Sequence, residues 1–137
     1  MKSLIITTAA ALALALTTGF AAPAHGNEAP EFVQDTFPEQ GVDAAWESIR
    51  SVFMDPEAAL DGKTKELIAL AVSAQIPCDY CIYSHTRAAE AHGATDAEIR
   101  EALATGALIR KWSTMLNGHQ YDMDRFRQEI DAMLAGE

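Results

Sequence analysis

The feature that most constrains the fold is a helical spacing of apolar residues, which begins near Gly41 and continues almost to the C-terminus. Four breaks interrupt it, at Asp55-Pro56, Ile76-Pro77, Gly93 and Asn117-Gly118. Because a residue before proline avoids the helical region and glycine readily forms a left-handed cap, these breaks predict separate helices. No segment after the N-terminal leader shows strand-like alternation of useful length, so we expect an all-α fold.

The spacing predicts five helices. The first, over residues 42–53, carries one apolar stripe that includes Trp46 and Phe53. The second, over residues 61–75, is apolar nearly all round and should be central and buried. The third covers residues 78–92. The fourth opens with a capping box formed by Thr95 and Glu98 and runs to about residue 116. The last amphipathic helix covers residues 123–134.

The N-terminus is expected to lie outside the folded domain. Lys2 precedes an uncharged apolar stretch over residues 4–20, and small residues offer cleavage sites after Ala24 or Gly26. We therefore predict a secretory signal peptide over residues 1–26 and a periplasmic or secreted protein; the alternative is an uncleaved anchor. Residues 27–40 resemble a linker or extended arm, and residues 41–137 form the predicted domain.

The charge of the mature chain excludes some partners. After loss of the leader, 9 Lys and Arg remain against 20 Asp and Glu, a formal charge of −11. Such an acidic chain is not expected to bind nucleic acid or anionic lipid. No later segment is long and apolar enough to cross a bilayer. About 111 residues support only a modest core, so association between copies would help the fold.

The candidate site begins with the only two cysteines, Cys78 and Cys81, and with His85 four residues later. At ~100° of rotation per helical residue, these three side chains share an arc of roughly 60°. The cysteines lie in the first turn of a helix, where free backbone N–H groups favour thiolate. A nearby imidazole can accept the thiol proton. This arrangement is typical of a redox site.

Glu66 lies on the preceding helix, about as far before the break at Ile76-Pro77 as His85 lies after it. If the two helices fold back on each other, a rise of ~1.5 Å per residue brings the carboxylate level with the imidazole. Glu66 would then orient His85, as the acid does in a catalytic triad. The alternative is a solvent-facing Glu66 paired with Lys63 or Lys65.

The spacing Glu66-x11-Cys78-x2-Cys81-x3-His85, set in the apolar string at residues 65–72, resembles the carboxymuconolactone decarboxylase family. Its closest branch is the alkyl hydroperoxide reductase D-like (AhpD-like) members, and the similarity covers about residues 43–118. The resemblance implies an all-α domain built around a central antiparallel helix hairpin that carries the cysteine pair. It also implies a trimer or hexamer. We expect no cofactor.

The resemblance further implies a thiol peroxidase or disulfide reductase. Cys81 would attack a hydroperoxide, Cys78 would resolve the resulting sulfenic acid, and His85 and Glu66 would relay protons. The partners would be a hydroperoxide or disulfide substrate and an unidentified thiol reductant. Well-studied members carry a second histidine where this chain has Tyr80, a poor base near neutral pH. They also draw electrons from a lipoyl carrier that an exported protein would not meet.

The same residues also fit two alternatives to a redox enzyme. Cys78, Cys81 and His85, with Glu66 or His92 as a fourth ligand, have the composition of a zinc site. A non-catalytic oligomeric scaffold with an inert disulfide is the third hypothesis. Elsewhere, His92 suits a helix C-terminal position, and no residue pairs His119 or Tyr121 with the site. Trp46 and Trp112 are expected in the core or an interface.

Overall fold

The computed structural model describes residues 28–136, and all regular structure within this part of the chain is helical. The elements in chain order are α1 (Glu31–Thr36), the 3-10 helix η1 (Glu39–Gly41), α2 (Val42–Ile49), the π-helix η2 (Arg50–Met54), α3 (Gly62–Gln75), α4 (Asp79–Ala91), α5 (Asp96–His119) and α6 (Met123–Ala135). The prediction of an all-α fold is confirmed. The signal peptide expected over residues 1–26 lies outside the described residues and stays a prediction.

Local signals set most of the helix boundaries. Asp55 is extended before Pro56 and ends η2. Gly93 follows α4 in the left-handed region, with φ of 80°, as predicted. Thr95 and Glu98 make both hydrogen bonds of the predicted capping box at the start of α5. These boundaries are therefore determined by residues that lie next to them in the sequence.

The end of α5 differs from the prediction. The helix passes through Asn117-Gly118 and ends at His119, and Gln120 takes the left-handed conformation with φ of 53°. The backbone N–H of Gln120 donates to the Asn117 carbonyl, which closes the last turn. Glycine inside a helix costs only about 1 kcal/mol relative to alanine, so Gly118 does not have to end it.

The segment expected as a linker or extended arm contains helix α1. Pro30 and Pro38 immediately precede α1 and η1 and do not interrupt them. Val33 of α1 is fully buried with Ala29 and Trp46, and residues of α2 pack around this cluster. The apolar contact explains the correction, because a helix of this length is not stable without tertiary packing.

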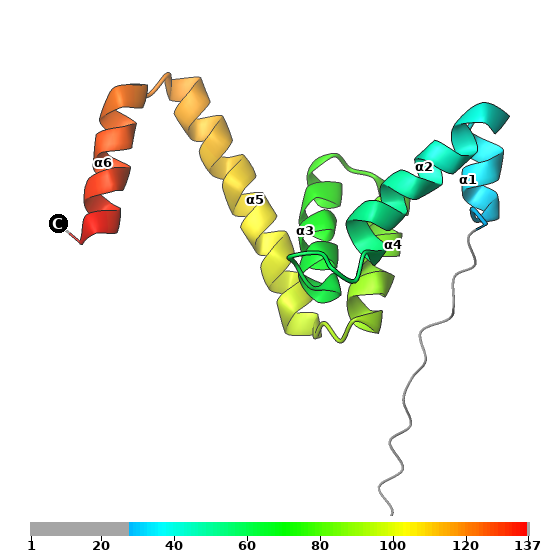
Figure 1. The fold of residues 1–137 in the computed structure, drawn as a ribbon. Coiled ribbons are helices and arrows are strands. Elements are labelled where there is room, and N and C mark those ends of the chain that lie inside the picture. Colours follow the sequence, from blue (N-terminus) through cyan, green and yellow to red (C-terminus); the bar gives the residue numbers. More distant parts are fainter. Residues whose placement is uncertain (1–27, 137) are drawn as a thin grey trace, which may run out of the picture.

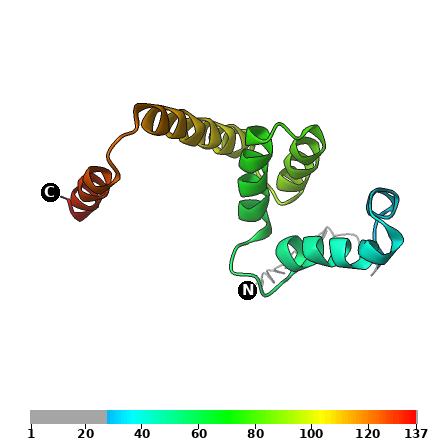
Figure 2. The ribbon, with the colours of Figure 1, turned by 90° about the horizontal axis from the view of Figure 1, so that it is seen from above.

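Helix α3 lies at the centre of the remaining fold. It packs against α4 and α5 and also contacts η2, and the arrangement can be followed in Figure 1 and, from above, in Figure 2. Glu66, Leu70 and Ser73 are its buried residues and lie on one face. Ile68 and Val72 are exposed. The predicted central position is confirmed, whereas burial on all sides is not.

The outer part of the molecule is formed by α5 and α6. Lys63 at the start of α3 donates to Glu98 at the start of α5 at 2.7 Å, which ties the two helices together at one end. From there α5 extends away from the other helices, and α6 lies at its far end (Figures 1 and 2). Neither helix contains a buried residue. Several of their large apolar side chains, among them Trp112 and Met115, are exposed, whereas others, such as Leu103 and Phe126, are half-buried.

Candidate active site

The two cysteines lie at the N-terminus of α4 and form a disulfide with a Cα–Cα distance of 5.3 Å. Cys78 is the N-cap residue, and its Sγ accepts a hydrogen bond from the Cys81 backbone N–H at 3.2 Å. The backbone N–H of Cys78 donates to the Ser73 carbonyl of α3. Both cysteines are half-buried. After reduction, a thiolate here would lie at the positive end of the helix dipole.

Glu66 and His85 meet between α3 and α4. Because a carboxylate only accepts, we assign the proton to Nδ1 of His85, which donates to Oε2 of Glu66 at 2.6 Å. Glu66 is 6% exposed, and the His85 side chain is 24% exposed. The predicted approach of these two side chains is confirmed. The solvent-facing alternative for Glu66 is wrong, although the catalytic roles stay predictions.

The geometry leaves one imidazole nitrogen for chemistry. With Nδ1 held by Glu66, Nε2 of His85 is the nitrogen available as a base. Cys81 precedes His85 by one helical turn, so the two side chains lie on the same face of α4. A reduced Cys81 and His85 therefore have the relation expected of a nucleophile and its general base.

Phe53 is a site residue that sequence reasoning missed. Its ring stacks on the His85 imidazole, with centroids 5.2 Å apart and planes inclined by 29°. The sequence predicts Phe53 on the apolar stripe of the first helix. The structure places it in the π-helix η2, and the sequence carries no evident signal for that wider turn. Only the tertiary structure shows its contact with the site.

The other candidate residues lie apart from this arrangement. His92 occupies the C-cap position of α4, as predicted. Its ring lies so close to Gly62 that a Cβ added there would be 2.5 Å from it. Tyr121 donates to Glu129, which raises the pKa of Tyr121, and thus it belongs to the α5–α6 connection. Tyr80, between the cysteines, is 90% exposed.

The zinc interpretation does not fit this oxidised form, because the two sulfur atoms are bonded to each other. Across residues 28–136, no group of three or more His, Cys, Asp or Glu side chains is arranged to hold a metal ion. The zinc hypothesis therefore concerns the reduced protein. Within the same residues, no helix has both the length and the apolar character to cross a membrane.

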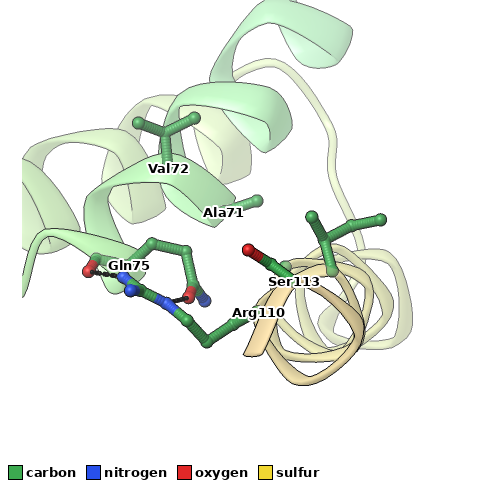
Figure 3. Close-up of a pocket in the computed structure, with 7 residues that line it drawn as sticks. Ala71, Val72, Gln75, Arg110 and Ser113 are labelled. Carbon is green, nitrogen blue, oxygen red and sulfur yellow. Dashed lines mark hydrogen bonds between the residues drawn. The ribbon is translucent and has the colours of Figure 1, made fainter. Parts of the chain in front are cut away.

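A shallow groove of about 370 Å³ separates α3 from α5 and contains none of the predicted site residues. Arg110, which lines the groove from α5, donates to the side chain and the backbone carbonyl of Gln75, as Figure 3 shows. Gly106 lies against Ala71, where an added Cβ would be 3.2 Å from the Ala71 carbonyl oxygen. The two helices thus approach closely at Gly106 and Ala71. Val72, which also lines the groove, is exposed.

Comparisons with known proteins agree with this architecture. Residues 40–121 match the carboxymuconolactone decarboxylase family. The chain is similar to the crystal structure of an alkylhydroperoxidase AhpD core from Rhodospirillum rubrum, with a TM-score of 0.60 and 36% identity. That similarity covers 66% of this chain and 65% of the solved one.

A curated relative from Paracoccus denitrificans, described as uncharacterized protein 4 in the cox locus, is 44% identical over 59 residues. The match covers 43% of this chain and 51% of the relative, so this chain spans about half of the relative's length. The family and the Cys78–Cys81 disulfide together fit a redox function. The family match over residues 40–121 and the shared all-α structure show that this chain belongs to the carboxymuconolactone decarboxylase family and is AhpD-like.

Proposed function

We propose that this protein is an exported thiol-dependent oxidoreductase that reduces hydroperoxides or disulfides. One observation carries the proposal. A disulfide at the start of α4 lies one helical turn before His85, whose Nδ1 is held by the buried Glu66. A redox couple and an oriented imidazole together supply a thiol nucleophile and a base for its proton near neutral pH.

The proposed reaction starts from the reduced pair. His85 accepts the Cys81 proton, and the thiolate attacks the terminal oxygen of the hydroperoxide. The O–O bond breaks, an S–O bond forms, and the departing alkoxide takes the proton from His85 to leave as an alcohol. Cys78 then attacks the Cys81 sulfenic acid, which forms the disulfide and releases water. Two thiols are oxidised for each hydroperoxide reduced.

The cycle is completed by an external thiol reductant of the exported compartment. Two thiols of that donor exchange with the Cys78–Cys81 disulfide, so the donor becomes a disulfide and the protein regains its dithiol form. The order of the two cysteines follows the family resemblance. The position of Cys81 one turn before His85 supports that order.

Thiol counting tests the proposal. The reduced protein, freed of reductant, is mixed with hydrogen peroxide or cumene hydroperoxide, and free thiols and remaining peroxide are measured. We expect two thiols to be lost for each peroxide consumed. Cys78→Ser should stop at a sulfenic acid that dimedone traps, and Cys81→Ser should be inactive. Tyr83→Phe is the matched control, because Tyr83 is 72% exposed and lies on the side of α4 opposite His85.

The proposal fails if the reduced parent consumes no peroxide, loses no thiols and behaves like Cys81→Ser. A parent that instead reduces a disulfide substrate such as oxidised glutathione would retain the thiol chemistry and exclude the peroxidase branch. Elemental analysis of the reduced protein, purified without chelator, decides the zinc alternative, since stoichiometric zinc would contradict a free redox pair. Mass determination of the mature protein from a periplasmic fraction tests the proposed export and cleavage.

We also propose that copies of this chain associate through α5 and α6, as the trimer or hexamer implied by the family would require. Seven apolar side chains on these helices are about half or more exposed: Leu108, Ile109, Trp112, Met115, Met123, Met133 and Leu134. At roughly 100 Å² each, they offer roughly 700 Å², close to the roughly 800 Å² per partner of a stable interface.

Light scattering after gel filtration tests this assembly. Trp112, 52% exposed, is the largest of these side chains. Trp112→Glu should lower the molar mass of the particle, because a charge would have to be buried in the contact. Thr114→Glu, an exposed position on the opposite side of α5, is the control and should leave the mass unchanged. A parent that is monomeric at micromolar concentration would contradict the proposal.

A further inference from the structure

Phe53 covers one face of the imidazole on which the proposed chemistry depends. The ring centroids of Phe53 and His85 are 5.2 Å apart, and the planes are close to parallel at 29°. Phe53 is half-buried, and η2, which carries it, also contacts α3. Three elements therefore meet at His85: α4 carries it, α3 supplies the carboxylate, and η2 supplies the aromatic ring.

The π-helix explains why Phe53 reaches this position. The apolar residues of α2 pack into the cluster of Ala29, Val33 and Trp46. At Arg50 the helix widens into a π-turn, and Phe53 lies outside that cluster. A wider turn changes the direction in which the following side chains point, and such turns are frequent at functional sites. Here the change carries Phe53 from the α2 cluster to the imidazole on α4.

We propose that Phe53 is a positioning residue, which keeps the His85 ring in the orientation that pairs Nδ1 with Glu66. The carboxylate holds one edge of the ring, and a flat stack restricts rotation about the bond that joins the ring to Cβ. A neighbouring apolar ring also excludes water from the hydrogen bond, which strengthens it. Nε2 is then kept available for the proton of Cys81. This last step rests on the proposed thiol chemistry.

The first test is spectroscopic and does not depend on activity. In the oxidised parent, the proton on Nδ1 of His85 should give a resolved downfield NMR signal that exchanges slowly with water. The protons on the carbon atoms of the His85 ring should show a chemical-shift change caused by the ring current of Phe53. Phe53→Leu should abolish that shift and accelerate the exchange. Phe53→Tyr, which keeps an aromatic ring, should retain the ring-current shift and the slow exchange.

The second test measures peroxide reduction by the reduced protein. Because small displacements of a catalytic group are costly, Phe53→Leu should lower kcat about tenfold with little change in KM. Phe53→Tyr should be close to the parent. Phe32→Leu, which alters a phenylalanine that is 64% exposed in α1, is the matched control and should have no effect. Phe53→Met replaces Phe53→Leu if the latter does not fold, because methionine fills irregular space without an aromatic ring.

The two tests separate this inference from the proposed function. If the parent reduces no hydroperoxide, the proposed function fails, and the spectroscopic test still decides whether Phe53 holds the imidazole. The inference is overturned if a folded aliphatic variant keeps the slow exchange of the His85 Nδ1 proton. It is also overturned if Phe53→Tyr accelerates that exchange as much as Phe53→Leu does.

Discussion

The pairing of Glu66 with His85 should contribute measurably to stability, and a double-mutant cycle gives its size. The Glu66 side chain is nearly buried, and its carboxylate is 2.6 Å from Nδ1 of His85. Removing one partner of a buried pair costs about 3–5 kcal/mol, because the remaining charge has no compensation. The 24% exposure of the His85 side chain admits some water, so we expect about 3 kcal/mol for His85→Ala.

Neutralising the carboxylate should be milder. In Glu66→Gln the amide oxygen can still accept from Nδ1, so only the difference between a charge-assisted and a neutral hydrogen bond is lost, about 1 kcal/mol. In the double variant no buried charge remains, and the coupling free energy between the two positions should be about 1–2 kcal/mol. Loss of the Phe53 stack occurs in both arms of the cycle that remove His85 and therefore cancels.

Urea unfolding at pH 7 with the disulfide intact measures the four free energies. Protein concentration is kept constant, because association between copies would add to the apparent stability. The control cycle uses Asp124 and Arg127, an exposed pair on α6 at 2.8 Å, which should couple by no more than about 0.5 kcal/mol. A coupling below about 0.3–0.5 kcal/mol for Glu66 and His85 would mean independent sites and would refute the reasoning.

Two further predictions concern the contact between α3 and α5. The hydrogen bond from Lys63, with those from Thr95, lowers the pKa of Glu98 from 4.5 to about 2. The resulting stability is present above about pH 4.5 and is lost as the pH falls towards 2. Glu98→Gln should therefore reduce the pH dependence of the unfolding free energy, measured by urea unfolding, between these pH values. An unchanged pH dependence would contradict this. Gly106→Leu should lower the free energy of unfolding by about 1–3 kcal/mol, because the added atoms meet Ala71. Gly118→Ala should raise it by up to about 1 kcal/mol, because an added Cβ there meets nothing within 4 Å. Thermal unfolding with equal losses at both glycines would show that this close approach does not matter.

Much of the candidate site could be predicted because its spacing is local. Cys81 and His85 share a face of α4 through helix periodicity alone. The position of Glu66 beside His85 follows from the rise per residue along the two helices on either side of one short turn. The hydrogen bond between Glu66 and His85 bears out that reasoning. Phe53 could not be placed in the same way, since its position depends on a change of helix type at Arg50.

The fold was less predictable wherever tertiary contacts outweighed local signals. Two prolines and weak periodicity favoured an extended arm, yet Val33 docks on Trp46 and stabilises a short helix. An Asn-Gly pair favoured a helix end, yet α5 continues to His119. In both places the local preference is worth about 1 kcal/mol or less, which a buried apolar side chain or an uninterrupted hydrogen-bond ladder readily exceeds.

The sequence by itself determined the helical class, most helix boundaries and the grouping of Cys78, Cys81, His85 and Glu66, because each depends on backbone preference or on spacing within two adjacent helices. Only the tertiary structure decided what surrounds that group. It buried the Glu66 carboxylate, placed Phe53 on the imidazole and left large apolar side chains of α5 and α6 exposed. Such features arise from contacts between residues distant in sequence, and no local pattern encodes them.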